Sequence, residues 1–301
     1  MNFVSVIVVT YNSASTISGC LKSILAQEPE GQFFDVTVVD NASSDETTRI
    51  VSGEFPQVTL IKNGINTGFA STVNQAAAVA KGTYFLLLNP GVIVQESFIK
   101  RMLEFVQGNH LAAVVGCNLV DREGKHQPSC WKKPGAMRLF LETFLPYRLS
   151  LPLVSDNPVL LAEVKMVTSS CMAIKREVFE RLRGFDSGFF MYYEDADFCF
   201  RARRAGYKIF FNPGITVFHQ SGGSEADPAV LLLLRYKSRE LFFRKHFTPL
   251  RAMIAQWIII AGIALRIPIC WIAGRLFFNE KLLRLSNYHN FVREEWAWTS
   301  E

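Results

Sequence analysis

The stretch Tyr84-Phe-Leu-Leu-Leu-Asn-Pro-Gly-Val-Ile-Val94 decides the fold class of this chain. Its large apolar residues run to Leu88, stop at Asn89-Pro90-Gly91 and then resume. A strand without alternating polar residues is buried on both faces, which is typical of a parallel sheet covered by helices. Asn-Pro-Gly indicates a sharp turn at the end of that strand. Because open α/β sheets bind ligands at the carboxyl ends of their strands, a ligand is expected at this uncharged turn.

Strands and helices alternate on both sides of this stretch. Over the first ~110 residues the alternation predicts a doubly wound, mostly parallel sheet with helices on both faces. Strands are expected at 3–9, 36–39, 58–61 and 83–88. Between and after them, one helix is expected to end near 27, a second to begin at 43–45, a third to end near 80 and a fourth to span 97–106. Further along, strand character returns at 164–174, 208–211 and 215–218, and helices are expected at 177–182, 195–205 and 229–247.

The composition fits a globular α/β protein with a large core. Of the 301 residues, 49% are hydrophobic and 20% are charged. Neither GxGxxG nor GxxxxGK[ST] occurs, which argues against dinucleotide oxidoreductases and P-loop NTPases. Six cysteines form no CxxC pair and no metal-ligand spacing, so reduced thiols in a cytosolic core are expected. The N-terminal run lacks a basic region and a small-residue cleavage site, so it is interpreted as the first strand rather than a signal peptide.

The C-terminal part is basic and apolar. Between Arg235 and Arg284, ten Lys or Arg stand against two acids, a charge of +8, so the rest of the chain sums to −3. Residues 252–274 are mostly apolar and, as a helix, would be about 35 Å long, enough to cross a bilayer. Arg266 and Pro268 interrupt them, which favours a helix or kinked hairpin lying in the leaflet of an anionic membrane. A true span and a buried helical hairpin that closes the soluble domain are the alternatives.

Polar residues follow the first strands and meet at one edge of the predicted sheet. They are Thr10-Tyr11-Asn12, Asp40-Asn41, Asn66-x-Gly68 and Asn89-Pro90-Gly91. Asp40 can accept a hydrogen bond from a ribose hydroxyl or a base N–H, and Gly68 would let a backbone approach a ligand closely. Each taken singly is explained as an ordinary strand-ending turn. Together they favour a nucleotide site.

A second cluster places Glu194, Asp195 and Asp197 at the start of a helix, directly after an aromatic loop that includes Tyr193. The helix dipole alone explains one or two carboxylates at that position. A carboxylate in an apolar wall has a raised pKa and suits a general base. The neighbouring aromatic rings suit the apolar faces of sugars.

A third candidate is His219, which follows a strand and precedes the Gly-rich run 220–224. A lone histidine is usually structural or merely exposed. Here the free backbone N–H groups of a Gly-rich turn favour an anion, so His219 is predicted to contact a diphosphate or a metal.

The order of these motifs resembles a family 2 glycosyltransferase with a GT-A fold, and most closely its bacterial rhamnosyltransferase-like branch. The motifs are VIVVTYN, VVDNASSD, NTGFA, LLLNP, GFDSGFFMYYEDADFCFRARRAGY and HQSGGS. The resemblance covers about residues 3–224. It implies a glycosyltransferase domain over 1–224, with a nucleotide-binding half (1–118) and an acceptor and catalytic half (119–224). Residues 225–301 are expected to form a helical, membrane-associated C-terminal region.

The resemblance also assigns roles. It implies that Asp195 is the catalytic base, which deprotonates an acceptor hydroxyl so that the attack inverts the anomeric carbon. Tyr193, Glu194 and Asp197 are expected at the acceptor, and His219 and Asn89 at a metal (Mg or Mn) or the diphosphate. The residues expected to bind the donor are Thr10, Tyr11, Asn12, Asp40, Asn41, Asn66, Gly68 and Asn89.

One position departs from the family pattern. Where the family usually has a metal-binding Asp after LLLNP, this chain has Gly91. Three explanations are open: the metal is held by His219, Asn89 or water; the enzyme works without metal; or the chain has lost activity and kept binding.

The function expected from the sequence is an inverting transferase at the cytoplasmic face of the inner membrane, peripheral or shallowly inserted. It would move a sugar, with rhamnose the first candidate, from a nucleotide-diphosphate donor to a lipid-linked saccharide in cell-surface polysaccharide or O-antigen synthesis. The alternative is a non-catalytic nucleotide-sugar-binding or scaffold protein of a polysaccharide assembly complex. Nucleic acid is not an expected partner, because the basic tail interleaves its charges with aliphatic runs.

Overall fold

The structure is a computed structural model that describes residues 3–27, 34–109, 111–131, 136–144, 157–220 and 228–276. The chain forms two compact units. Unit 1 comprises residues 1–133, 155–190 and 194–225, and unit 2 comprises 134–154, 191–193 and 226–301. Positions 221–224 of the Gly-rich run after His219 lie outside the described residues.

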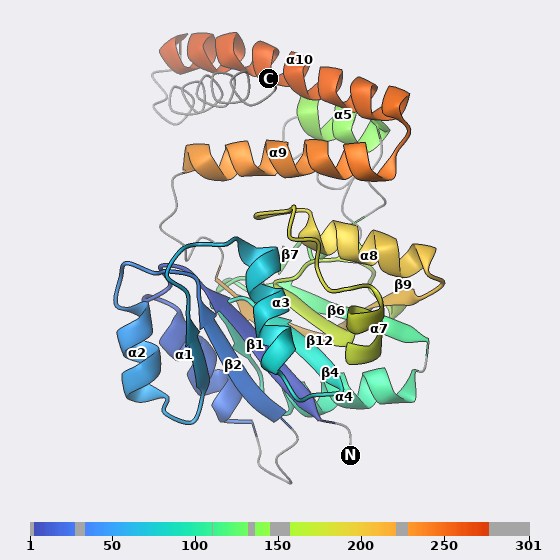
Figure 1. The fold of residues 1–301 in the computed structure, drawn as a ribbon. Helices are drawn as coiled ribbons and strands as arrows, with labels where there is room; N and C mark the ends of the chain where they lie inside the picture. Colours follow the sequence, from blue (N-terminus) through green and yellow to red (C-terminus); the bar gives the residue numbers. More distant parts are fainter. Residues whose placement is uncertain are drawn as a thin grey trace. The chain divides into compact units, whose positions relative to one another are not determined.

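Unit 1 is built on a mostly parallel sheet with the strand order β3-β2-β1-β4-β11-β6-β12-β5. β1 pairs in parallel with β2 and β4, whereas β11 runs antiparallel between β4 and β6, and β5 runs antiparallel to β12. The expected doubly wound α/β class is confirmed (Figure 1). The strands are β1 (Val4–Thr10), β2 (Phe34–Asp40), β3 (Thr59–Lys62), β4 (Tyr84–Leu88), β5 (Val92–Val94), β6 (Ala112–Val120), β7 (His126–Gln127), β8 (Cys130–Trp131), β9 (Ala162–Glu163), β10 (Met166–Val167), β11 (Cys171–Lys175) and β12 (Lys208–His219).

Several strand assignments differ from the sequence prediction. The strand character expected at 164–174 is divided between β10 and β11, which lie in different sheets. The strands expected at 208–211 and 215–218 are one strand, β12, whose register against β6 shifts between Asn212 and Thr216. Pro213 and Gly214 lie in that irregular stretch, and both residues mark bulges within strands. The buried strand β6 was not predicted, although Gly108 and Asn109 separate its apolar run from the preceding helix.

Helices cover both faces of the sheet. The helices of unit 1 are α1 (Ile17–Leu25), α2 (Thr47–Glu54), α3 (Phe69–Val79), α4 (Phe98–Gly108), α7 (Arg176–Arg181) and α8 (Glu194–Arg204). Val6 and Val8 of β1 point into one core cluster with α1, α2 and α4. Phe85 of β4 points to the other face, where its ring packs edge-on against Phe179 of α7. The apolar run 84–88 is therefore buried from both sides, as predicted.

Unit 2 contains three described helices, α5 (Ala136–Phe144), α9 (Pro228–His246) and α10 (Pro249–Leu276). α10 packs against α5 and α9 through a narrow stripe that includes Ala255, Ile259 and Ile263. A Cβ atom at Gly262 would lie 1.9 Å from the Cγ2 atom of Thr143, so α5 and α10 can approach this closely only at a glycine. The remaining faces of α10 are largely exposed.

The two hairpin alternatives for the C-terminal apolar segment are wrong. α10 is one continuous helix of 28 residues, about 42 Å long, and Pro268 lies inside it. By length and composition alone, Pro249–Ile272 is long and apolar enough to cross a membrane, and only 22% of its most apolar part is buried. A core helix or a signal sequence passes the same test, so this alone is weak support for a membrane span.

Candidate active site

The ends of β1 and β2 bring two predicted donor residues together. Thr10 and Asp40 are register partners, and the Thr10 hydroxyl donates a hydrogen bond of 3.0 Å to Oδ1 of Asp40. Asp40 is only 2% exposed and also accepts hydrogen bonds from the backbone N–H and the hydroxyl of Ser43. The Asp40 carboxylate therefore organises the turn after β2.

Asn41 organises the next loop along the same edge. Its Nδ2 donates to Oδ1 of Asn66 at 2.7 Å, and its own Oδ1 accepts from the backbone N–H of Thr67 at 3.0 Å. Gly68 follows with a φ of +83°, and a Cβ atom there would lie 2.5 Å from the carbonyl oxygen of Phe190. The close approach expected at Gly68 is present, but the neighbour is the protein's own backbone at Phe190.

Tyr11 and Asn12 differ in their exposure to solvent. Asn12 has a φ of +48°, and its Oδ1 accepts a hydrogen bond of 2.9 Å from the backbone N–H of Ser44, which joins the ends of β1 and β2. Tyr11 is 37% exposed. Among these edge residues, the Tyr11 ring is thus the one presented to solvent, where it can stack on a base.

The carboxylates at the start of α8 have different surroundings. Asp195 is half-buried, and its Oδ2 accepts a hydrogen bond of 3.1 Å from the backbone N–H of Ser169. Glu194 is 5% exposed, and its Oε2 is buried without a hydrogen-bond partner. Burial, with the nearby charge of Asp195, raises the pKa of Glu194 to about 8. Glu194 therefore keeps its proton at neutral pH. The Asp195 carboxylate differs because it accepts hydrogen bonds from the backbone N–H groups of Ser169 and Ala196.

Asp197 has a structural partner. It is 1% exposed, and its Oδ2 accepts a hydrogen bond of 2.7 Å from Nε of Arg201 in an ion pair one helical turn along α8. Arg201 also donates to the carbonyl oxygens of Leu182 and Gly184, at 2.8 and 2.9 Å. The pair fixes the turn before the aromatic loop, and the acceptor contact expected for Asp197 stays a prediction.

His219 is held by Gln127, a residue that sequence reasoning missed. Nε2 of Gln127 donates to the carbonyl oxygen of His219 at 3.0 Å, which directs Oε1 of the same amide at Nδ1 of the imidazole, 2.8 Å away. An amide oxygen can only accept, so Nδ1 carries the ring proton and Nε2 carries a lone pair. Burial lowers the pKa of His219, which keeps the ring neutral. No motif signalled Gln127, because β7 has only two residues.

The uncharged turn at the end of β4 contacts backbone on two sides. Asn89 donates its N–H to the carbonyl oxygen of Ser170 at 3.0 Å, and its Oδ1 accepts from the N–H of Gly91 at 3.0 Å. The Gly91 carbonyl accepts from the N–H of Gln220 at 2.9 Å. A Cβ atom at position 91 would lie 2.5 Å from the Gln220 carbonyl oxygen. Glycine is therefore required here by close packing against the residue that follows His219.

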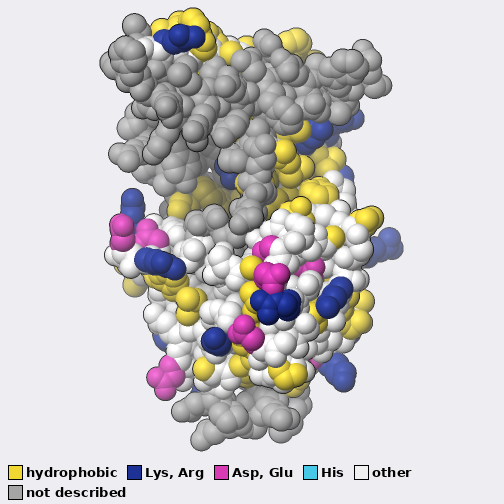
Figure 2. All heavy atoms as spheres, turned by 90° about the vertical axis from the view of Figure 1, so that its left-hand side faces the viewer, with side chains coloured by type: hydrophobic (Ala, Val, Ile, Leu, Met, Phe, Trp, Pro, Cys, Tyr) yellow, Lys and Arg dark blue, Asp and Glu magenta, His cyan; other side chains and the backbone are white. Residues whose placement is uncertain are grey.

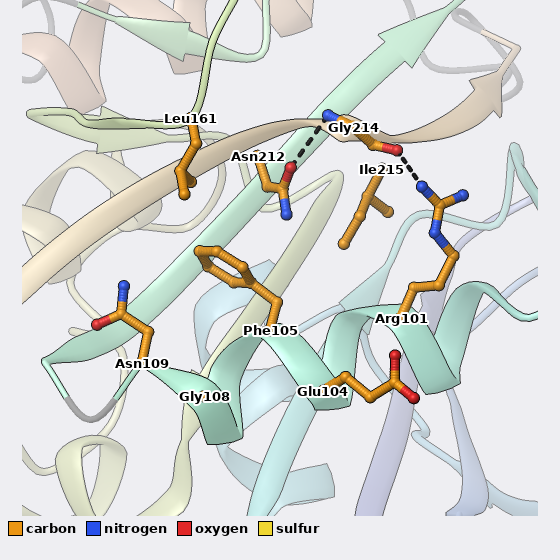
Figure 3. Close-up of a pocket in the computed structure, with 9 residues that line it drawn as sticks. All are labelled: Arg101, Glu104, Phe105, Gly108, Asn109, Leu161, Asn212, Gly214 and Ile215. Carbon is orange, nitrogen blue, oxygen red and sulfur yellow. Dashed lines mark hydrogen bonds between the residues drawn. The ribbon is translucent and has the colours of Figure 1, made fainter.

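A pocket in unit 1 lies apart from these residues (Figure 3). It has a volume of about 530 Å³ and lies between α4 and the irregular part of β12. Its lining residues are Arg101, Glu104, Phe105, Gly108, Asn109, Leu161, Asn212, Gly214 and Ile215. None of them is a predicted site residue, so the clustered strand-end and α8 side chains define the candidate site instead.

A complete set of metal ligands is absent from the described parts of the chain. The residues outside the gaps contain no group of three His, Cys, Asp or Glu that could hold a metal ion. On the face shown in Figure 2, acidic and basic side chains are interspersed rather than gathered by sign. The expectation that nucleic acid is not a partner stays a prediction.

Similar proteins agree on a class of enzyme. The chain is 27% identical over 285 residues to an N-acetylglucosaminyl-diphospho-decaprenol L-rhamnosyltransferase of Mycobacterium tuberculosis, covering 87% of this chain and 90% of the relative. It is 25% identical over 224 residues to the rhamnosyltransferase WbbL of Escherichia coli K12, covering 72% of this chain and 83% of the relative.

Solved structures share the fold. The mannosyltransferase PcManGT of Pyrobaculum calidifontis, in complex with GDP-Man and Mn²⁺, has a TM-score of 0.57 at 17% identity and covers 96% of this chain and 84% of its own. TarS of S. aureus, residues 1–349 with UDP, has a TM-score of 0.55 at 17% identity, with coverages of 90% and 74%. These likenesses support the GT-A fold.

Two family descriptions match the sequence. "Glycosyl transferase family group 2" matches residues 140–299. "Glycosyl transferase family 2" matches residues 5–183, which is more than half of the chain and includes the strand ends described above. The protein is thus a glycosyltransferase, and it belongs to glycosyl transferase family 2.

Proposed function

We propose that this glycosyltransferase moves a sugar, with rhamnose as the first candidate, from a nucleotide diphosphate to a lipid-linked saccharide with inversion. One observation carries the proposal. Two consecutive residues, Ser169 and Ser170, connect Asp195 to the end of β4. The N–H of Ser169 donates a hydrogen bond to Asp195, and the carbonyl oxygen of Ser170 accepts one from the N–H of Asn89. This connection supports the proposal that the donor edge and the carboxylate belong to one site in unit 1.

In the proposed reaction, Asp195 takes the proton of an acceptor hydroxyl. The acceptor oxygen then forms a bond to the anomeric carbon from the side opposite the diphosphate. The bond between that carbon and the diphosphate oxygen breaks, and its electron pair leaves with the diphosphate. Glu194, which holds its own proton, does not compete for the acceptor proton.

We also propose a divalent cation, Mg or Mn, beside His219. An Nε2 atom without a proton cannot donate to a phosphate oxygen, but it can bind a metal, and a hydrogen bond at Nδ1 is the usual support for such a ligand. Such cations need few protein ligands when substrate phosphates supply the others. The PcManGT complex contains Mn²⁺. A bound metal would offset the charge of the leaving diphosphate.

The lipid-linked acceptor and the membrane location are supported by α10 and by the name of the mycobacterial relative. Trp257 and Trp271 are 64% and 51% exposed on α10, and Arg251 and Arg275 flank the apolar face. Arg266 is turned inward, where its Nη1 donates to the hydroxyl of Tyr236 at 3.4 Å. An apolar face between basic ends suits an anionic lipid surface. The cytoplasmic face stays a prediction.

The non-catalytic alternative rests on Gly91, which supplies no metal ligand. Close packing against Gln220 gives that glycine a structural reason that is independent of activity. The transfer assay below distinguishes the two functions.

The test is transfer by the full-length protein on lipid vesicles, with a panel of nucleotide-diphosphate sugars and a polyprenyl-diphosphate saccharide as acceptor. We expect turnover with one donor class, product of inverted anomeric configuration by NMR, and a loss of roughly 10²- to 10⁴-fold in kcat for Asp195→Asn. Full turnover by Asp195→Asn, or a product that retains configuration, would contradict the mechanism. Tight nucleotide binding without transfer for every donor would support the non-catalytic alternative.

A further inference from the structure

A three-residue segment, Met191–Tyr193, belongs to unit 2, although the residues on both sides of it belong to unit 1. We call this segment the 191–193 strap. The next residue along the chain is Glu194, the first residue of α8, and Asp195 follows it. The strap is thus joined by a single peptide bond to the helix that begins with the proposed base.

All three strap residues contact α9 within unit 2. The buried hydroxyl of Ser238 donates a hydrogen bond of 2.7 Å to the carbonyl oxygen of Met191. The guanidinium of Arg235 lies 4.8 Å from the centre of the Tyr192 ring. Nε of Arg239 donates to the hydroxyl of Tyr193 at 2.9 Å. The strap is therefore held at its backbone and at both aromatic side chains.

The backbone of the strap needs such support. Tyr192 and Tyr193 have φ values of +69° and +66°, in the left-handed region that bulky residues seldom adopt. Two such residues in succession persist only where surrounding contacts over-determine them. In addition, the Tyr193 ring packs against the Phe242 ring of α9, with centroids 5.5 Å apart. Loss of these contacts would let the strap relax toward ordinary backbone angles.

We propose that Ser238 and Arg239 are positioning residues for the catalytic carboxylate, acting through the strap. The first residues of a helix follow the direction of the chain that enters it, so a relaxed Tyr193 would displace Glu194 and Asp195. Misplacement of a reacting group by about 1 Å can cost 10²-fold in rate. The proposal rests on the proposed role of Asp195. It makes the base depend on α9, a helix that also packs against α10.

The first test compares Arg239→Gln with Arg244→Gln on the full-length protein in vesicles. Both variants remove one positive charge from α9, but Arg244 is exposed and pairs with Glu240 rather than with the strap. We expect Arg239→Gln to lower kcat by about 10- to 100-fold with an unchanged KM for the donor. Arg239→Lys should regain part of the loss, and Arg244→Gln should behave as wild type.

A double-mutant cycle separates positioning from general damage. If Arg239 acts through the Tyr193 hydroxyl, Tyr193→Phe should cost little further activity in the Arg239→Gln background. Additive losses would overturn the proposal. So would an Arg239→Gln variant with kcat within twofold of wild type, or one whose donor affinity falls in parallel with kcat.

A readout that needs no substrate distinguishes this proposal from the proposed function. Hydrogen exchange of the amides at 190–196 should speed up in Arg239→Gln and in Ser238→Ala, and stay unchanged in Arg244→Gln. If the wild type transfers no sugar, the function fails while this measurement still tests the strap. Equal exchange in all three variants would overturn the strap even where the wild type is active.

Discussion

Two regions of unit 1 meet at the candidate site, and they are built in opposite ways. The start of α8 carries three carboxyl groups in different environments. Glu194 is buried, Asp195 is half-buried, and Asp197 is in an ion pair. The end of β4 carries no charge and is fixed by backbone contacts to Ser170 and Gln220. Substitutions in the first region should change protonation and chemistry, whereas substitutions in the second should change geometry.

The largest effect expected is a dependence of the unfolding free energy on pH, caused by the ionisation of Glu194. Its pKa is raised in the fold to about 8, so the folded state binds more protons than the unfolded state above the ordinary glutamate pKa. Its contribution to stability is complete below that ordinary pKa and is lost as pH rises toward about 8. The slope is at most about 1.4 kcal/mol per pH unit. Chemical denaturation from pH 5 to 8 measures it.

Glu194→Gln is the matched variant for that measurement. A neutral amide of the same shape should remove this part of the pH dependence and leave the variant more stable than wild type near pH 8. An identical pH profile for both proteins would mean that Glu194 is ionised in the fold, and the distinction drawn between the two adjacent carboxylates would fail.

Asp197→Asn should destabilise the fold by about 3 kcal/mol, because it leaves Arg201 without its buried partner. Removal of one partner from a buried ion pair costs about 3–5 kcal/mol. We expect the lower value here because the Arg201 side chain is 24% exposed. Asp195→Asn should change the unfolding free energy much less while reducing transfer. Thermal unfolding of the two variants tests this, and the reverse order of stabilities would show that the roles within α8 were assigned wrongly.

Gly91→Asp should not restore a metal site. The new side chain has to displace the Gln220 carbonyl, and overpacking of this kind costs about 1–3 kcal/mol. Gly53→Asp is the control, because open space surrounds a Cβ atom at that position. Thermal unfolding and Mn²⁺ titration compare the two. A Gly91→Asp protein that is as stable as the control and binds Mn²⁺ more tightly would show that the turn adapts to the family residue.

The smallest effect is expected from Gln127. Replacement by Met removes both hydrogen bonds to His219, so the proton of the imidazole is no longer confined to Nδ1. Loss of such a supporting residue typically weakens metal binding by about 10- to 100-fold. Mn²⁺ affinity by calorimetry and the ¹⁵N shifts of the His219 ring provide the measurement. Unchanged shifts and affinity would contradict the assigned tautomer.

The sequence predicted those features that depend on local pattern. The apolar run 84–88, the polar strand ends and the acidic start of α8 are visible as runs and spacings. The Asp197–Arg201 pair was also visible, as opposite charges four residues apart on a helix, although it was interpreted as part of a binding site. The continuity of α10 through Pro268 was not visible, because a proline inside an apolar run usually indicates a kink or a helix end.

Other features depend on contacts between distant segments and leave no local signal. The Gln220 carbonyl that requires Gly91 is more than a hundred residues away in sequence. Gln127 reaches His219 across 92 residues. Gly68 was interpreted as a point of ligand approach, because nothing in its neighbourhood points to Phe190. Such close approaches are set by the assembled sheet and loops.

We propose that the protein is a metal-using transferase although the end of β4 carries no acid. Sugar transfer by the full-length protein on vesicles, measured in EDTA and again after Mn²⁺ is restored, tests it most directly. We expect EDTA to abolish transfer, Mn²⁺ to restore it, and His219→Ala to need a higher Mn²⁺ concentration for the same rate. Transfer that is undiminished in EDTA, or unaffected by His219→Ala, would contradict it.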